Sequence, residues 1–282
     1  MKIGYLAHLV VVLGLLVVGV SAQPTMLRRT TQKTDKFDFG AGGTISIVGA
    51  PNGSIRIEGS NTNEVEITAD VELQAPTEAD LAALGQLTGF ILDQSIGRVS
   101  IISGGAHNKF GMKRLPKNIG KNLLTLPFRI DYSIKVPHYC DLEVDGGKGD
   151  LAISGVEGAM KINFVETNAK IEVISGATIA TFGSGTADIG IGTKGWKARA
   201  AVIDMARGDL TVRLPAATSA EIDASIIRTG SIENAFPNLK PLDRKVPFTD
   251  KAISAKAGVG GTPLKFTVGD GSLKLRLLKL PF

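Results

Sequence analysis

The chain has 282 residues, a formal net charge of +5, 34 glycines, 5% aromatic residues and one cysteine. A single cysteine excludes an intrachain disulfide framework, and we expect Cys140 to be a small buried apolar side chain. Glycine suits tight turns but weakens the interiors of helices and strands. The composition therefore predicts many short strands joined by glycine turns.

The first 22 residues have the features of a secretory signal. Lys2 gives a basic start, Leu9 to Val20 is an apolar run, and Val20-Ser21-Ala22 offers the small residues that a signal peptidase reads. We predict cleavage after Ala22; the alternative is an uncleaved anchor, because the apolar run and its flanks are almost long enough to span a bilayer. Cleavage leaves 282 − 22 = 260 residues without another segment of spanning length. We therefore expect an exported protein, in the periplasm, at the cell surface or outside the cell.

Residues 23–36 are predicted to be a disordered segment, and residues 37–128 to form an N-terminal β-region. Apolar and polar residues alternate in this region, as in strands that bury one face and leave the other in water. The alternation is clearest over residues 44–47, 54–58 and 65–68.

One stretch of the N-terminal region, from Thr77 to Ser95, instead has the pattern of a helix. Pro76 and Thr77 suit a helix start, and acidic Glu78 and Asp80 fall in the first turn. We expect this helix to pack on the β-region. Its apolar face consists of Leu81, Leu84, Thr88, Ile91 and Leu92.

Residues 129–282 are predicted to form a repeat region, because one short motif recurs in them. A glycine, a small polar residue and then Ile or Leu begin many strands: glycine permits a positive φ, the polar side chain bonds nearby backbone, and the apolar residue points inward. Between residues 149 and 192 the strand starts recur roughly every nine or ten residues. This regularity favours the stacked rungs of a β-solenoid, with a β-sandwich as the alternative. The motif occurs at Gly43-Thr44-Ile45, Gly53-Ser54-Ile55, Gly149-Asp150-Leu151, Gly208-Asp209-Leu210, Gly230-Ser231-Ile232 and Gly271-Ser272-Leu273.

Two segments interrupt the repeat. Residues 196–207 lack the expected glycine turn, which leaves the number of rungs there open. Residues 234–250 carry three prolines and are predicted to be a loop before the last rung. Leu273, Leu275 and Leu277 alternate in that last rung, and we expect the tail after it to cover its open edge.

The repeat motifs resemble those of the bacterial family named "putative adhesin", which consists of β-strand repeats. The resemblance rests on residues 131–137 (DYSIKVP), 149–158 (GDLAISGVEG), 208–215 (GDLTVRLP) and 260–273, and it extends over most of residues 37–277. A group related to this family is the head domain of autotransporter adhesins. The resemblance implies a right-handed single-stranded parallel β-helix, and it transfers no ligand, cofactor or catalytic residue.

The strongest indication of a binding site is a run without acidic residues between Asp93 and Asp131. Several basic residues of this run fall in a predicted loop, residues 104–121, where side chains are free to reach a ligand. An exported protein meets acidic polysaccharide or membrane headgroups rather than nucleic acid. The alternative is a solvated loop without a ligand. The predicted basic patch consists of Arg98, Lys109, Lys113, Arg114, Lys117, Lys121 and Arg129.

The other groups of residues that could form a catalytic or metal site are better explained by structural roles. His138 and Cys140 form a weak candidate for a Cys–His dyad. Glycine turns at residues 146–150 and 269–272 lack the ligand pattern of calcium loops. We therefore predict no catalytic residue, metal or cofactor, and an adhesin-like, non-catalytic role in presenting a surface. The alternatives are a glycan-cleaving β-helix enzyme and a periplasmic scaffold or envelope-stress accessory protein. The candidate carboxylates for the enzyme are Asp145, Asp150, Glu157, Glu166, Glu172 and Asp188.

Overall fold

The computed structural model describes residues 26–105, 121–192, 200–237 and 239–278, and only the backbone of Lys121 and Asn122. Hydrogen bonds join its seventeen strands into one sheet, which confirms the predicted all-β class. The first part of the chain contains β1 (Leu27–Asp38), β2 (Thr44–Val48), β3 (Ile55–Ser60), β4 (Glu64–Ala75), α1 (Glu78–Leu87), β5 (Gly89–Ser95), β6 (Arg98–Gly104), the 3-10 helix η1 (Lys121–Thr125), β7 (Phe128–Pro137), β8 (Asp141–Lys148) and β9 (Leu151–Ser154). The rest contains β10 (Met160–Val173), β11 (Thr178–Ile191), β12 (Ala201–Leu214), β13 (Ala220–Ile226), β14 (Gly230–Asn234), β15 (Lys240–Pro241), β16 (Ala252–Ala257) and β17 (Thr262–Leu277).

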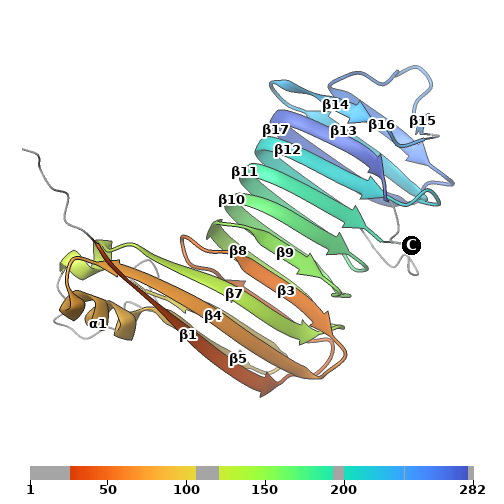
Figure 1. Ribbon diagram of the computed structural model, residues 1–282. Coiled ribbons are helices and arrows are strands. Elements are labelled where there is room, and N and C mark those ends of the chain that lie inside the picture. Colours follow the sequence, from red (N-terminus) through yellow and green to blue (C-terminus); the bar gives the residue numbers. More distant parts are fainter. Residues whose placement is uncertain (1–25, 106–120, 193–199, 238, 279–282) are drawn as a thin grey trace, which may run out of the picture.

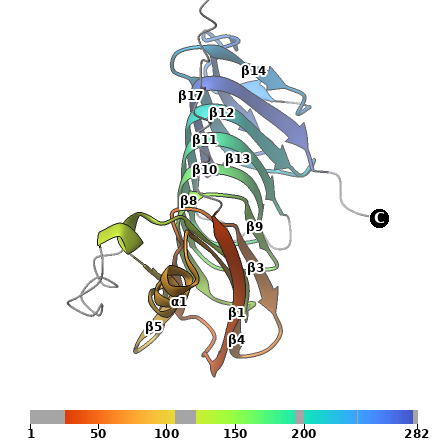
Figure 2. The ribbon, with the colours of Figure 1, turned by 60° about the vertical axis from the view of Figure 1, so that its left-hand side comes forward.

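Four long parallel strands, β10, β11, β12 and β17, form the centre of the molecule (Figure 1). Met160 of β10 lies opposite Thr178 of β11, so the register repeats after 178 − 160 = 18 residues. Each long strand has two halves: the first half of β10 pairs with β8 and its second half with β9. The strands accordingly curve around the core in Figure 2. The predicted spacing of roughly nine residues is therefore one half of an eighteen-residue unit.

Glycines make the bend between the two halves. Gly185, Gly208 and Gly271 lie opposite one another in β11, β12 and β17, all with positive φ. A Cβ on Gly208 would lie 1.9 Å from the carbonyl oxygen of Gly185, and a Cβ on Gly271 would lie 1.8 Å from that of Gly208. Only glycine permits both the backbone conformation and this close approach. The glycine of the predicted motif thus marks the bend of a strand.

Strands that are neighbours in sequence are separated in the stack at both ends. β2 lies between β6 and β8, and β3 lies between β7 and β9, in each case in parallel pairing. At the other end, β17 lies between β12 and the successive strands β13 and β14. The expectation that the leucine-rich C-terminal strand is the last rung was wrong, because this strand inserts into the stack.

The core is formed by alternate residues that point inward from both halves of the strands. Phe182 of β11, Phe266 of β17 and Ile203 of β12 are fully buried, as are Leu273 and Leu275. Burial of these apolar side chains against the next strand is the main stabilising contribution.

The predicted helix is present but shorter than expected. Thr77 is its N-cap, and the Thr77 side chain accepts a hydrogen bond from the backbone N–H of Asp80 (3.1 Å). Leu81 and Leu84 are buried beside β4. Residues 88–95 are not helical: Thr88 is extended, and residues 89–95 form β5 against β6. β-branched and aromatic residues suit a strand, and pairing with β6 satisfies the backbone there.

Two further predictions on irregular segments are corrected. Residues 27–36 are not disordered but belong to β1, which pairs along its whole length with β4. The loop over residues 234–250 contains the short strand β15. Most of the predicted loop over residues 104–121 lies outside the described residues, and its last residue begins η1. Among the described residues, no helix is long and apolar enough to cross a bilayer.

Candidate functional site

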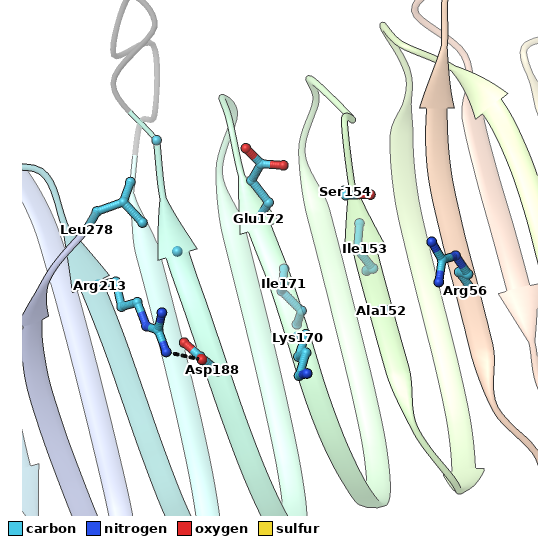
Figure 3. Close-up of a pocket in the computed structure, with 12 residues that line it drawn as sticks. Arg56, Ala152, Ile153, Ser154, Lys170, Ile171, Glu172, Asp188, Arg213 and Leu278 are labelled. Carbon is cyan, nitrogen blue, oxygen red and sulfur yellow. Dashed lines mark hydrogen bonds and ion pairs between the residues drawn. The ribbon is translucent and has the colours of Figure 1, made fainter. Parts of the chain in front are cut away.

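The outer face of the second strand halves contains a pocket of about 360 Å³ (Figure 3). This volume is in the range of small-molecule sites in proteins. Strands β3, β9, β10, β11 and β12 contribute to it, and Leu278 borders it from the end of the chain. The pocket is lined by Arg56, Ala152, Ile153, Ser154, Lys170, Ile171, Glu172, Asp188, Gly190, Gly192, Arg213 and Leu278.

The parallel register arranges the lining residues in two rows across the strands. In the first row Arg56, Ala152, Lys170 and Asp188 lie opposite one another on β3, β9, β10 and β11. Neighbouring strands are about 4.8 Å apart, so Arg56 and Lys170 emerge roughly 10 Å apart with only the methyl group of Ala152 between them. The first row therefore leaves a hollow between two cations.

The second row repeats this design with opposite charges. Glu172, Gly190 and Arg213 lie opposite one another on β10, β11 and β12. Gly190 has no side chain between the residues that carry the carboxylate and the guanidinium, and a Cβ on it would lie 3.4 Å from the side chain of Leu278. The amide N–H of Leu278 donates to the carbonyl oxygen of Leu214 (2.8 Å), which fixes this side of the pocket.

The charged groups of the pocket differ in their pairing. Arg213 forms an ion pair with Asp188 (2.5 Å), shown dashed in Figure 3, and Arg56 pairs with Glu58 on its own strand (2.5 Å). Lys170 and Glu172 form no ion pair or hydrogen bond within the described part of the chain. The ion pairs are solvent-exposed and contribute little to stability. The pocket thus presents one unpaired cation and one unpaired anion to a ligand.

The predicted basic patch is only partly within the described residues. Arg98 is paired with Glu143, and this hydrogen bond raises the pKa of the guanidinium. Arg129 is paired with Asp131 (2.7 Å). The charge of both arginines is thus partly compensated. The side chain of Lys121 and the whole of Lys109, Lys113, Arg114 and Lys117 lie outside the described residues.

The six candidate carboxylates of a glycan-cleaving site do not converge at one place: Glu172 and Asp188 line the outer-face pocket, and Asp150 and Glu166 line a separate pocket beside Lys148. Asp145 accepts from Asn163 (2.8 Å), Asp150 accepts from Asn168 (3.1 Å), and Glu166 pairs with Lys148 (3.0 Å). Glu157 lies 3.0 Å from the Nε2 atom of His138. Of the six, only Glu172 and Asp188 line the outer-face pocket, from adjacent strands.

The geometry opposes a Cys–His dyad. His138 is engaged with Glu157 rather than with Cys140. Cys140 is buried as predicted, and burial raises the pKa of its thiol to about 12, which disfavours the reactive thiolate. The turn residue Asp270 is held by Arg228 (2.6 Å), and the described residues contain no cluster of three His, Cys, Asp or Glu side chains arranged for a metal ion.

Sequence reasoning did not find Lys170, its small neighbour Ala152 in the first row, or Gly190 in the second row. The signal was nevertheless present, because residues eighteen apart occupy the same row: Ala152, Lys170 and Asp188 follow this spacing. A nine-residue spacing hides the row, because it mixes the two halves of each strand.

No family model and no curated protein matches the chain. Solved structures with a similar course of the chain include a "putative cell adhesion protein" from Clostridium sporogenes, with 14% identity, a TM-score of 0.46, and coverage of 89% of this chain and 100% of the other. A "putative adhesin" from Bacteroides fragilis has 12% identity and a TM-score of 0.32, with coverage of 87% and 97%. A "putative lipid binding protein" from Parabacteroides distasonis has 13% identity and a TM-score of 0.24, with coverage of 88% and 97%. At these values the likeness identifies neither a family nor an activity.

Proposed function

We propose that this chain is an exported, non-catalytic, adhesin-like surface protein that binds an acidic glycan or envelope polymer in the outer-face pocket. The observation that carries the proposal is the unpaired cation Lys170 on one side of Ala152, with Arg56, which shares its charge with Glu58, on the other side. A carboxylate or phosphate above Ala152 would contact both charges, and charge-assisted contacts of this kind are strong. The predicted signal segment supports export.

The second row suits the uncharged part of such a ligand. Sugar hydroxyls both donate and accept hydrogen bonds, and Glu172 and Arg213 offer an acceptor and a donor on either side of Gly190, beside the apolar side chain of Leu278. An acidic sugar would thus have its anionic group at the first row and its hydroxyls at the second. The basic loop residues Lys113, Arg114 and Lys117 remain a second proposed contact for the polymer.

The architecture fits a surface-presenting role. The eighteen-residue parallel register, with both halves of each strand belonging to one continuous strand, supports a β-solenoid more than a β-sandwich made of separate sheets. We propose the right-handed β-helix that the sequence resemblance implies. Such a stack presents rows of outward side chains at regular spacing.

Binding to an array of acidic and neutral glycans, and to anionic and neutral liposomes, tests the proposal at two salt concentrations. We expect salt-sensitive binding that Lys170→Gln weakens about tenfold, because one charge-assisted contact is lost. Lys265→Gln is the matched control: it removes the same charge from the outer face of β17, away from the pocket. The triple variant Lys113→Ser, Arg114→Ser, Lys117→Ser measures how much the basic loop contributes to binding. Equal binding by Lys170→Gln and the parent protein would contradict the assignment to the pocket.

A second candidate function is glycan cleavage, favoured by the presence of Glu172 and Asp188 in one pocket. Paired carboxylates flanking a sugar are the arrangement used by glycosidases. Release of product from a bound glycan, abolished by Glu172→Gln, would replace the binding proposal with this one.

A further inference from the structure

The N-terminal strand β1 is an open edge of the sheet. It pairs with β4 over all twelve residues and with no other strand of the described chain. The N–H of Phe39 donates to the carbonyl oxygen of Asn63 (2.8 Å), so this opposed pair is hydrogen-bonded. Because hydrogen-bonded and non-hydrogen-bonded pairs alternate in an antiparallel ladder, the odd-numbered residues of β1 bond to β4. The backbone groups of the even-numbered residues, Arg28 to Asp38, therefore point away from the sheet.

This edge is long and regular enough to accept another strand. It contains neither proline nor glycine, and its residues range from partly to fully exposed. One outward N–H, that of Lys36, is occupied by the carboxylate of Asp35 (2.8 Å). At the opposite end of the molecule, the outermost strand β15 has two residues, one of which is Pro241. Short strands and proline are the usual protection of a sheet edge.

We infer that β1 pairs antiparallel with β1 of a second copy of this chain, centred on Thr34. A two-fold axis requires reciprocal pairing, so that if residue i of one copy faces residue j of the other, then j also faces i, and outward backbone groups require that even-numbered residues face even-numbered ones. The two-fold axis must therefore pass through a pair of identical residues of β1 and cannot pass between two successive residues. The register is then selected by charge.

Charge selects Thr34 among the registers that overlap most of β1; a centre at Thr30 also opposes no like charges, but it pairs fewer residues of the strand. In a pairing centred on Thr34, Lys33, whose Nζ also donates to the carbonyl oxygen of Thr88 (2.7 Å), lies opposite Asp35 of the second copy. Gln32 lies opposite Lys36, and Thr30 opposite Asp38. No like charges face each other. A centre at Lys33 places two copies of that lysine face to face, and a centre at Gln32 places Arg28 opposite Lys36; opposed like charges destabilise a strand pair.

The dimer connects to the pocket through the sheet. Thr34, Thr68, Ser133 and Arg56 lie in one row across β1, β4, β7 and β3, and this row continues into the pocket. Both pockets of the dimer therefore belong to the same face of a continuous sheet. Two linked sites bind a polymer with higher avidity than one. Dimerisation itself does not depend on the proposed glycan binding.

Cysteine substitution tests the register. Residue 34 would lie opposite its own copy at a Cα distance of about 5.5 Å, within the range of a disulfide. We expect Thr34→Cys to form a cross-linked dimer on mild oxidation or with a short bis-maleimide. Gln32→Cys and Thr30→Cys, on the same face of β1, should cross-link at least tenfold more slowly. Native Cys140 is buried and does not compete.

Proline substitution tests the backbone bonds in the uncrosslinked protein. Thr34→Pro removes an outward N–H and leaves the bonds of the odd-numbered residues to β4 intact. In sedimentation equilibrium we expect a dimer of the parent protein and of Thr34→Val. Thr34→Pro should raise the dimer dissociation constant at least tenfold without changing the circular dichroism spectrum.

Three results would overturn the inference: a parent protein that is monomeric at 100-fold the concentration used for glycan binding, equal dimerisation of the Pro and Val variants, or faster cross-linking at residue 32 than at residue 34. A dimer that binds no glycan would contradict the proposed function alone. A monomer that binds glycan would contradict the dimer alone.

Discussion

The two ends of the strand stack are built by the same insertion but are closed differently. At the N-terminal end β2 and β3 insert between strands that follow them in the sequence, and at the C-terminal end β17 inserts between strands that precede it. Beyond the insertion, β16 and the two-residue β15 cover β13 at the C-terminal end. At the N-terminal end α1 covers buried residues, and the twelve-residue β1 leaves its outer edge open.

The comparison separates two requirements of a stacked sheet. The apolar core must be sealed at both ends, and both ends meet this requirement with buried side chains, Leu81 in α1 and Ile253 in β16. Backbone groups at the last strand must also be blocked or paired. Within the described residues, the C-terminal end blocks one edge with the two-residue β15, whereas the five-residue β14 pairs only with β17. The open N-terminal edge is therefore a surface for pairing.

The largest contrast is expected from deleting one terminal strand at a time. Removal of residues 259–282 takes β17 from the middle of the stack and exposes the edges and inner faces of β12 and β13, so we expect loss of cooperative folding and insoluble protein. Removal of residues 1–38 takes away no fully buried side chain of β1 and should lower the free energy of unfolding by about 1–3 kcal/mol. Soluble expression and chemical denaturation measure both. Comparable losses from the two deletions would show that β1 is part of the core.

A smaller contrast is expected between two glycines near the C-terminal end. Gly271→Ala places a Cβ 1.8 Å from the carbonyl oxygen of Gly208, and we expect a loss of at least about 3 kcal/mol. Gly261 also has a positive φ (+120°), but its Cβ position is open, and Gly261→Ala should cost only about 1–2 kcal/mol. Urea denaturation of both variants separates the steric effect from the conformational one. Equal costs would mean that the stacked glycines are not in close contact.

The smallest contrast is in pH dependence. Burial raises the pKa of Tyr132 and of Cys140 in the N-terminal half to about 12, from ordinary values of 10.0 and 9.0. Both groups favour the folded state fully below pH 9, and this stabilisation is lost as the pH rises toward 12. At the other end, hydrogen bonds from Arg228 and Thr229 lower the pKa of the exposed Asp270 to about 2, so its contribution is present above pH 3.8 and lost as the pH falls through 2.

Urea midpoints from pH 2 to 11 test these assignments. Tyr132→Phe combined with Cys140→Ala should flatten the alkaline decline, and Asp270→Asn should slightly flatten the acid decline. An unchanged alkaline decline in the double variant would contradict the role of the two buried groups.

Local features of the fold could be predicted from the sequence, but the order of strands in the stack could not. The alternation of residues 44–47 or 273–277, the N-cap at Thr77 and the burial of Cys140 follow from interactions over a few residues. The end of the helix was predicted too late in the sequence. Residues 89–95 form a strand because they pair with β6, and this partner comes after a turn and is not visible in the local pattern. The insertion of β17 depends on contacts with residues that are about sixty positions away, such as Ala201 opposite Leu264. The pocket was missed for the same reason, since its rows exist only once the strands are in register.

The register of the stack has a consequence for how such a chain changes over evolution. Met160 and Thr178 are separated by 18 positions, but Thr178 and its next partner Ala201 by 201 − 178 = 23, and Ala201 and Leu264 by 264 − 201 = 63. The strands nevertheless keep one alignment, so the connecting segments can lengthen without disturbing the layers. The closure of a longer loop costs little entropy. The connection after β11 is thus a position where new sequence can be acquired, or a foreign epitope grafted, while the layered scaffold stays unchanged, whereas the residues between β12 and β17 supply strands β13 to β16 of the sheet.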